Sequence, residues 1–364
     1  MRIITSEQVS AGHPDKICDQ IADAIVTDCL RHDRNSRVAI ECLFKNRCLV
    51  IAGELTSTHE PDYKALVQQV FDRINNGGAE NSDAGLDYKL DFSADDLDIA
   101  ILVDHQSSDI ALGVNVGGAG DQGMMYGYAT NETPEMLPIP FVLATRFLEL
   151  LKVYPCRMLK ADAKAQVSYD YDSGRITTFL CSVQHIRDVD VEDFRPIIEK
   201  LMVRTATEYG LNTDFEKLVN PTGRFVLGSS FADCGVTGRK LACDTYGGIG
   251  HIGGGAMSGK DPSKVDRSGA YAARKIARDI VSAGYADMAE VQIAYAIGVA
   301  EPVSVYVETF GTEHQDTEFI NQYVSENYDL TPRGIIEGLG LLDVDYNAVS
   351  AYGHFGKQEL PWEK

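Results

Sequence analysis

Apolar and polar positions follow two different periods along the chain, and the period changes repeatedly. The segment PDKICDQIADAIVTDCL begins with Pro14, a residue typical of the first helical position, and keeps its apolar residues on one helical face: Ile17, Ile21, Ala24 and Ile25. The runs RVAIECLF and RCLVIAGEL follow as two strands joined by the short polar turn Lys45-Asn46. A helix followed by a strand pair is therefore predicted near the N-terminus.

The same alternation continues to the end of the chain. PDYKALVQQVFDRI predicts a second helix, DIAILV a strand, and AQVSYDYDSGRITTFLCSV a hairpin that turns at Asp172-Ser173-Gly174. EVQIAYAIGVAEPVSVYVETFG predicts another strand pair, interrupted near Pro302. Strand pairs and helices recur about three times without a visible sequence repeat, which indicates an α+β protein and suggests a three-fold architecture. Composition shifts near residues 104–117 and near Gly228 mark candidate domain boundaries.

Bulk composition adds limits on the class of ligand. The 364 residues are 44% hydrophobic and 24% charged, as in ordinary soluble proteins. The net charge of −21 argues against general binding of nucleic acids or anionic membranes. Residues 239–278 nevertheless hold eight lysines and arginines against three acids. This local basic region leaves room for a polyanionic small ligand.

Cysteine usage and the N-terminal segment indicate the compartment. The eight cysteines form no CxxC pair and no zinc-like spacing with histidine, so reduced structural thiols are expected. The segment MRIITSEQVSAGHPDK has no secretory core, and no apolar run approaches about 18 residues. A cytoplasmic protein is predicted.

The stretch GGGAMSGKDPSKVDRSGAYAARK, residues 253–275, starts like a phosphate-binding loop. A Walker A loop requires Ser or Thr after Lys260, but Asp261 stands there. Pro262 fits the first turn of a helix that continues to Gly284. The expected helix start carries a glycine nest, two lysines and Asp266, which suits polyphosphate with Mg²⁺. A ligand-binding loop is favoured over an ordinary turn.

A second candidate is SAGHPDK, where His13 and Asp15 flank a proline at the start of a predicted helix. Asp15 has the chemistry to bind a hard cation and His13 to donate to a phosphate oxygen. The alternative is a helix cap, with Asp15, Asp19 and Asp23 forming an acidic stripe on a solvated face. Taken alone, this motif favours the structural alternative.

Other short motifs are weak by themselves. GGAGDQG satisfies the dinucleotide spacing around Asp121, but no periodic helix follows it. Three further segments place charged or aromatic residues near turns, where an ordinary surface turn is the commoner explanation. They are ADAK with Asp162 and Lys164, NPTGRF with Arg224 and Phe225, and DCGVTGRK with Asp233, Arg239 and Lys240.

Taken together, these segments resemble the S-adenosylmethionine synthetase family. GHPDK, GAGDQG, DAK, NPTGRFV, DCGxTGRK and GGGAxSGKDPSKVDRS occur in the family's order and at similar spacing, over nearly the whole chain. The resemblance implies an α+β fold of three similar β-sheet-plus-helix domains related by pseudo-three-fold symmetry. We expect an N-terminal domain at 1–103, a gating loop at 104–117, a central domain at 118–226 and a C-terminal domain at 228–364. Dimers or tetramers with active sites between subunits are also implied.

The family's reaction converts ATP, L-methionine and water to S-adenosylmethionine, pyrophosphate and phosphate. The neutral thioether attacks C5′ of ATP, so no general base is needed, and two Mg²⁺ ions per site and K⁺ are the implied cofactors. Two alternatives are a polyphosphate-cleaving enzyme that makes no sulfonium and a non-catalytic regulatory paralogue. The conjunction of acidic and basic site residues disfavours both.

The resemblance assigns roles to individual residues. Catalytic roles fall to His13, Lys164, Arg239, Lys264 and Asp121. ATP is assigned to His13, Asp162, Lys164, Arg224, Phe225, Asp233, Arg239, Lys240, Ala256 and Lys260. Methionine is assigned to Glu54, Gln106, Asp121, Asp233 and Lys264. Mg²⁺ is assigned to Asp15 and Asp266, and K⁺ to Glu41.

The chain also departs from the family pattern. The gating loop is short, with Ser108 where a proline is usual. Segment 229–232 replaces a Gly-Gly-Pro pattern, Met257 replaces a common phenylalanine, and Ile252 a common histidine. These changes concern the adenine and methionine side more than the phosphate side, so ATP binding is a firmer expectation than strict methionine preference.

Overall fold

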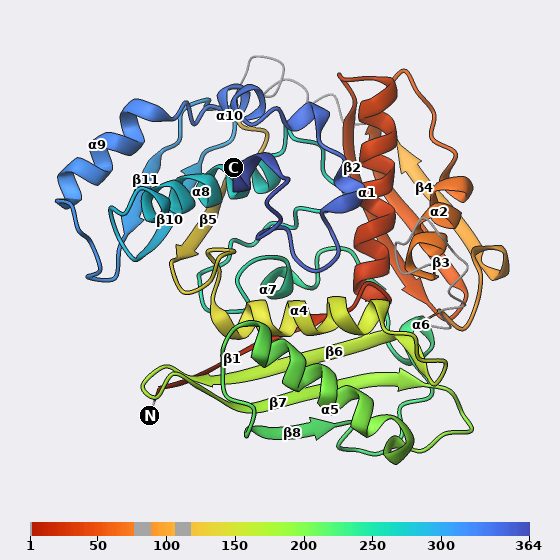
Figure 1. The fold of residues 1–364 in the computed structure, drawn as a ribbon. Helices are drawn as coiled ribbons and strands as arrows, with labels where there is room; N and C mark the ends of the chain where they lie inside the picture. Colours follow the sequence, from red (N-terminus) through yellow and green to blue (C-terminus); the bar gives the residue numbers. More distant parts are fainter. Residues whose placement is uncertain (1, 76–88, 106–117) are drawn as a thin grey trace.

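The computed structural model describes residues 2–75, 89–105 and 118–364. Within these ranges the chain forms three β-sheets, and helices pack on each of them (Figure 1). The three sheet-and-helix units lie side by side around a centre that contains the short helix α7 (Leu241–Asp244). The predicted α+β arrangement is confirmed.

The first sheet has the strand order β4-β3-β2-β9. β2 (Arg37–Lys45) pairs antiparallel with β3 (Cys48–Thr56), and β3 pairs parallel with β4 (Asp98–Asp104). The short β9 (Gly235–Val236) adds to the free edge of β2. α1 (Pro14–His32) and α2 (Tyr63–Asn75) belong to this unit, where Phe71 of α2 meets Phe44 of β2 edge-on. Alternate residues of β2 are buried, as period-two strands require.

The second sheet has the order β1-β6-β7-β8. β1 (Ile3–Val9), β6 (Leu159–Asp170) and β7 (Arg175–His185) are antiparallel neighbours, and β8 (Glu216–Val219) runs parallel to β7. Gly174 lies at the predicted hairpin turn with a φ of 67°, a left-handed conformation that glycine adopts without strain. The covering helices are α4 (Ile139–Val153) and α5 (Val191–Glu208).

The third sheet has the order β11-β10-β5, with β5 (Gly123–Thr130), β10 (Met288–Tyr295) and β11 (Ser304–Glu308) all antiparallel. α8 (Val265–Ser282) packs against it, and α9 (Thr317–Asn327) lies near β11. A Cβ atom on Gly127 of β5 would lie 2.0 Å from the carbonyl carbon of Ala273 in α8. Glycine at this position therefore permits the close approach of helix and sheet.

Short elements complete the described chain. They are α6 (Ser229–Ala232), α10 (Pro332–Gly338) and four 3₁₀ turns, η2 (Ala94–Asp96), η3 (Leu341–Asp343), η4 (Tyr346–Ala348) and η5 (Pro361–Glu363). None of the helices that the structure describes combines the length and the apolar character needed to cross a membrane.

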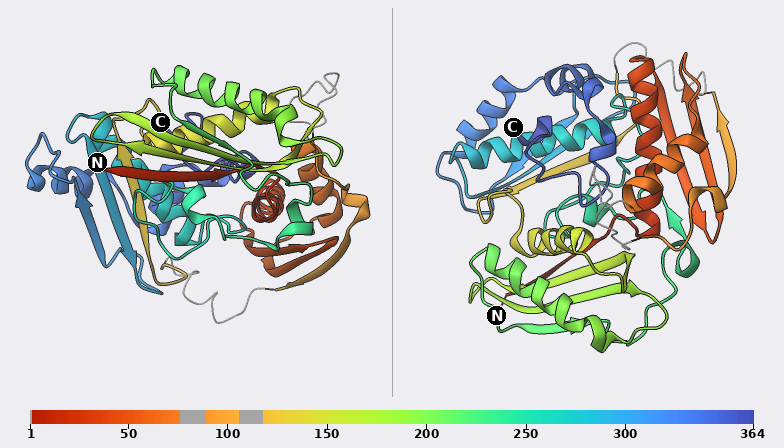
Figure 2. Two further views of the ribbon diagram at one scale, coloured as in Figure 1. Left: turned by 90° about the horizontal axis from the view of Figure 1, so that it is seen from below. Right: turned by 45° about the vertical axis from the view of Figure 1, so that its right-hand side comes forward.

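The three sheets do not follow the order of the chain (Figure 2). β1 pairs with β6, more than 150 residues later, and β5 pairs with β10 at a similar separation. β9 returns from the C-terminal part of the chain to the N-terminal sheet. The domain boundaries given above remain a prediction, and the sheets interleave across them.

The helices and strands named from the hydrophobic pattern are confirmed, with one correction. The last long helix begins at Val265 with Lys264 as its N-cap, so Pro262 lies in a turn before it rather than in its first turn. Its end is as predicted, because Gly284 follows the helix with a φ of 70°. The glycine segment ending at Gly123 leads into strand β5, which agrees with rejecting a dinucleotide-binding unit there.

Candidate active site

The N-terminus of α1 places His13 at the edge of a charged cluster. His13 is the N-cap residue, and its Nδ1 accepts a hydrogen bond from the backbone N–H of Asp15 at 3.2 Å. Burial, together with the nearby cations Lys240 and Lys164, lowers the pKa of His13 to about 3. The imidazole is therefore neutral at physiological pH, with its proton on Nε2 because Nδ1 is an acceptor.

Asp15 connects this helix end to the segment that contains β9. Its Oδ1 accepts from the Val236 backbone N–H at 2.9 Å, and its Oδ2 accepts from Lys240 Nζ at 2.6 Å. Ligand atoms of His13, Asp15 and Asp233 all lie within 4.8 Å of one another. Carboxylates supply the oxygen donors that a hard cation prefers, so Asp15, with Asp233 nearby, fits the expected Mg²⁺.

Strand β6 brings Asp162 and Lys164 to the same place. Burial raises the pKa of Asp162 to about 6, although a hydrogen bond from the Ser229 backbone N–H and the charge of Lys164 oppose the shift. The bond from Ser229 is 2.7 Å long and ends on Oδ2. The other oxygen, Oδ1, is buried and has no hydrogen-bond partner among the described residues. Buried acceptors without a partner are rare in proteins, and a donor group on a bound ligand would satisfy this one.

We expect Asp162→Asn to stabilise the fold in a pH-dependent manner. The pKa is raised from 3.8 to about 6 on folding, so ionisation favours the unfolded chain as pH rises through this window. The amide removes that cost, which amounts to about 3 kcal/mol above pH 6 at 1.36 kcal/mol per pKa unit. Urea unfolding of both proteins from about pH 4 to 8 measures it. A stability gain that did not grow with pH would contradict the assignment.

The acidic stripe on α1 corrects one expectation. Asp15, Asp19 and Asp23 do not lie on a solvated face, because all three side chains are buried. Each carboxylate accepts a backbone N–H from a later loop: Val236 to Asp15, Gly238 to Asp19 and Gly259 to Asp23. The stripe therefore anchors the DCGVTGRK and GGGAMSGKD segments against α1. The four-residue spacing shows in the sequence that the three acids share one face of the helix. Whether that face is buried depends on chain segments more than 200 residues away.

Lys16 and Asp244 are site-supporting residues that the sequence reasoning missed. Lys16 is buried and donates to Asp19 and to Asp244. Burial lowers the pKa of this lysine, but the two carboxylates outweigh it and the net shift is upward. Burial raises the pKa of Asp244, with Lys16 acting against the rise. Through Lys16, Asp244 is attached to the first turns of α1, next to Asp15 in the chain.

Asp261 holds the glycine loop before α8 in place. It follows Lys260, at the position where a Walker A loop has Ser or Thr. Asp261 is buried, and it accepts from the backbone N–H groups of Val38 and Ser263 and from Lys264 Nζ. Lys260 pairs with Ala39 of β2 through the backbone and with Asp266 through its side chain, at 2.5 Å. An acid at this position therefore attaches the loop to the first sheet, a role unrelated to holding a metal by a hydroxyl.

One pocket of about 330 Å³ gathers four predicted residues from separate parts of the chain: Glu41, Glu54, Ala256 and Lys260. Glu41 lies on β2 and Glu54 on β3, while the other two belong to the glycine loop. A Cβ atom on Gly238 would lie 2.4 Å from the Cβ atom of Ala256, so the loop also packs against the DCGVTGRK segment. The expected potassium and methionine positions thus adjoin the expected polyphosphate loop.

Other predicted residues lie elsewhere. Arg224 and Phe225 line a separate pocket of about 760 Å³ with Asp91, Lys160, His185, Ile186, Arg187, Val226 and Leu227. Asp121 is exposed two residues before β5, and Arg239 is exposed and donates to the Cys234 carbonyl at 3.3 Å. Gln106 and most of the predicted gating loop, including Ser108, lie outside the described residues. The two pockets have no lining residue in common.

Comparison with known proteins gives the geometry a context. Three models described as the N-terminal, central and C-terminal domains of S-adenosylmethionine synthetase match residues 1–108, 116–225 and 227–364. These matches follow one another along the chain and cover nearly all of it. The chain belongs to the S-adenosylmethionine synthetase family. It is therefore an enzyme, an ATP-dependent transferase of S-adenosylmethionine biosynthesis.

Individual members of the S-adenosylmethionine synthetase family are similar over their full length. The S-adenosylmethionine synthase of Mesoplasma florum is 44% identical over 375 residues, covering 100% of this chain and 97% of the relative. That of Mycoplasma mycoides subsp. mycoides SC is 42% identical, covering 100% of this chain and 95% of the relative. A solved structure, entitled "Structure of an Unusual S-adenosylmethionine synthetase from Campylobacter jejuni", has a TM-score of 0.90 at 37% identity, covering 100% of this chain and 97% of that chain. The predicted three-domain fold is confirmed.

Two departures from the S-adenosylmethionine synthetase pattern lie together in space. Ile252 and Met257 line one small pocket that also contains Asp266 and Tyr126. A third departure, Ser229, has a φ of 50°, which is unusual for a residue with a side chain, and its backbone N–H is held by Asp162. All three therefore contact or adjoin residues expected to bind substrate or metal.

Proposed function

We propose that this protein makes S-adenosylmethionine from ATP and L-methionine. The thioether sulfur attacks C5′ of ATP and displaces the triphosphate, which the same site then hydrolyses to pyrophosphate and phosphate. One observation carries the proposal: a buried, neutral His13 at the N-terminus of α1 lies beside Lys164, Lys240 and Asp15. This arrangement suits a reaction whose main demand is stabilisation of a departing polyanion.

The residues divide into three tasks. His13 donates through Nε2 to the oxygen that leaves C5′, a bond that strengthens as charge develops there. Lysine and arginine side chains bind the triphosphate and the substrate carboxylate: Lys164, Arg239, Lys240, Lys260 and Lys264. Acidic and amide side chains surround methionine and favour the sulfonium that forms: Glu54, Gln106, Asp121 and Asp233. Asp162, Arg224, Phe225 and Ala256 hold the nucleoside, and since Arg224 and Ala256 line different pockets of one chain, the proposal takes them from different subunits.

We propose that Asp15 and Asp266 hold two Mg²⁺ ions and that Glu41 lies near K⁺. Each of the two aspartates pairs with a lysine, Asp15 with Lys240 and Asp266 with Lys260. With Mg²⁺ held at these carboxylates, Lys240 and Lys260 would be available to contact phosphate oxygens. Bound Mg²⁺ supplies neutralisation of the triphosphate charge.

Self-association is part of the proposal. Several large apolar side chains are exposed on strands of the first and third sheets: Leu43, Ile101, Leu102, Met124, Val305 and Tyr306. Such apolar surface supports burial against a second copy, as a dimer or tetramer with active sites between subunits. The proposed location of the protein is the cytoplasm, and its net charge of −21 argues against nucleic acids and anionic membranes as partners.

The test is incubation of the purified protein with ATP, methionine, Mg²⁺ and K⁺, with mass spectrometry of S-adenosylmethionine and a parallel phosphate assay. One sulfonium, one phosphate and one pyrophosphate per ATP are expected. Reactions without methionine, and with tripolyphosphate in place of ATP, serve as controls. Phosphate without sulfonium would leave a polyphosphate-cleaving enzyme, and neither product would leave a non-catalytic member of the family.

Adding one methyl group beside Asp266 should impair the reaction. A Cβ atom on Gly255 would lie 2.1 Å from Asp266 Cγ, so Gly255→Ala must displace this carboxylate. Misplacement of a positioning group by about 1 Å costs up to about 100-fold in rate. The neighbouring Gly254→Ala is a matched control, because a Cβ atom there meets nothing within 4 Å. Steady-state kcat/KM for both variants is the measurement, and equal activities would remove Asp266 from the site.

A further inference from the structure

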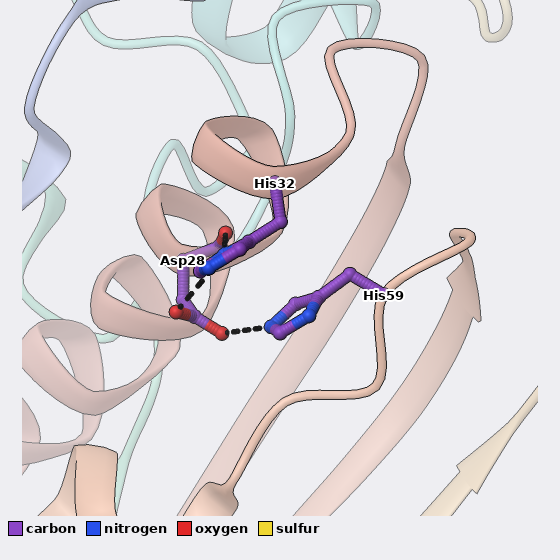
Figure 3. A group of neighbouring side chains, drawn as sticks. All are labelled: Asp28, His32 and His59. Carbon is purple, nitrogen blue, oxygen red and sulfur yellow. Dashed lines mark hydrogen bonds and ion pairs between the residues drawn. The ribbon is translucent and has the colours of Figure 1, made fainter.

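Three potential metal ligands lie at the end of α1 opposite the candidate active site (Figure 3). Asp28 and His32 belong to the last turns of the helix, and His59 comes from the loop after β3. At 1.5 Å per residue, Asp28 is about 20 Å along the helix from Asp15. The group therefore lies away from His13 and Asp15, and it shares no residue with those assigned to ATP, methionine and Mg²⁺.

The three side chains already converge. Asp28 and His32 are four residues apart and share one face of the helix. His59 Nε2 lies 2.7 Å from Asp28 Oδ2, and His32 Nδ1 lies 3.5 Å from Asp28 Oδ1. One ligand atom from each residue lies within 4.8 Å of the other two. The two imidazole rings are stacked, with centroids 3.9 Å apart and 15° between their planes.

The loop that carries His59 is held in place by its own hydrogen bonds. Asp33 Oδ2 accepts from both the backbone N–H and the hydroxyl of Thr58, each at 2.9 Å. Ser57 Oγ accepts from the His59 backbone N–H at 3.1 Å and bonds Ser36 Oγ at 2.8 Å. These contacts fix the His59 backbone relative to the helix end, which lowers the entropy cost of bringing a third ligand to an ion.

We propose that Asp28, His32 and His59 bind a divalent transition-metal ion of the Zn²⁺ type. Two imidazoles and one carboxylate are a donor set that suits such ions, whereas Mg²⁺ and Ca²⁺ prefer oxygen donors alone. Three protein ligands leave a coordination position for water. With about half of its side chain exposed, His32 keeps the group accessible from solvent.

Metal binding has a defined local consequence. A ring nitrogen binds a metal in the plane of its own ring, so the two stacked rings must turn apart when they share one ion. The ion then links the C-terminal end of α1 to the loop after β3, two parts of the same sheet-and-helix unit. Because it binds the folded chain, it raises the thermal unfolding temperature as its concentration exceeds the dissociation constant.

The experiment is titration of the purified full chain with Co²⁺ and with Zn²⁺. Mg²⁺ and a non-hydrolysable ATP analogue are present to occupy the active site. Visible absorption of Co²⁺ reports the ligand type, and thermal unfolding with Zn²⁺ reports stabilisation. The variants are His32→Ala and His59→Ala, with His314→Ala as a matched control, since His314 is an exposed histidine that ion-pairs with Asp287, outside the proposed site.

We expect one equivalent of Co²⁺ to bind with a nitrogen- and oxygen-type spectrum and Zn²⁺ to raise the unfolding temperature. Either site variant should weaken binding at least about tenfold, while the control variant behaves as the parent. Far-UV circular dichroism establishes that each variant is folded, and His59→Gln is used if the alanine variant is not. Parent-like affinity in both site variants, a thiolate-type spectrum, or no binding by the parent would overturn the proposal.

Discussion

Replacing His13 with asparagine should lower the rate of S-adenosylmethionine formation by about 100- to 1,000-fold while leaving the fold intact. The rate falls because a neutral donor to the leaving oxygen is lost, and loss of one such donor commonly costs about 3 kcal/mol or more in the transition state. The fold survives because His13 is the N-cap of α1, and asparagine is among the best N-cap residues. Single-turnover formation of the sulfonium, with saturating ATP and methionine, is the measurement.

The matched comparison for this variant is His314→Asn, which changes an exposed histidine outside the candidate site. Its rate and its unfolding temperature should both equal those of the parent. If His13→Asn retained near-parent turnover, the assignment of the leaving-group donor would be wrong. If its unfolding temperature fell sharply instead, the effect on rate would report lost helix capping rather than chemistry.

Replacing Arg267 with alanine should destabilise the protein by about 3–5 kcal/mol, the usual cost of breaking a buried ion pair from one side. Arg267 is fully buried in α8, ion-pairs with Asp23 of α1 and donates to the Met257 carbonyl at 2.6 Å. Its guanidinium also lies 4.3 Å from the centre of the Tyr346 ring. The change leaves the buried Asp23 without its cation, and the free energy of unfolding from urea titration measures the cost.

Two comparisons separate the buried charge from loss of packing. Arg333→Ala removes an arginine whose ion pair with Glu337 is exposed, and it should cost no more than about 1 kcal/mol. Adding Asp23→Asn to Arg267→Ala should recover part of the loss, since the orphaned carboxylate is then neutral. Burial already raises the pKa of Asp23 even with Arg267 present. A cost for Arg267→Ala as small as that of Arg333→Ala would show that the pair does not hold α1 and α8 together.

Local pattern predicted the elements well because periodicity and turn chemistry act over a few residues. Pro14 at a helix start, Gly174 at a hairpin turn and Gly284 after a helix all have the conformations their residue types favour. The strand order was beyond this reasoning. Pairing of β1 with β6 and of β5 with β10 depends on contacts across more than 150 residues. Hydrophobic periodicity and turn residues describe only near neighbours in the chain, so they do not predict which strands pair.

The candidate site shows the same division. The GHPDK and GGGAMSGKD segments were singled out because a helix N-terminus, glycines and paired charges are chemically suited to phosphate. What the acids of α1 do was misjudged, because a four-residue spacing describes a solvated face and a buried one equally well. This face is buried because loops cover it and donate backbone N–H groups to Asp15, Asp19 and Asp23.

The interleaving of the sheets has a consequence for biosynthesis. As the chain leaves the ribosome, β1 is made first but waits for β6, and β5 waits for β10. The edge of β2 is likewise not covered until β9 is synthesised. Strand edges that remain unpaired during translation invite association with other nascent chains, and non-local pairing slows folding. Most of the chain must therefore be translated before any sheet in this protein is complete, so the nascent chain keeps unpaired strand edges for much of its synthesis.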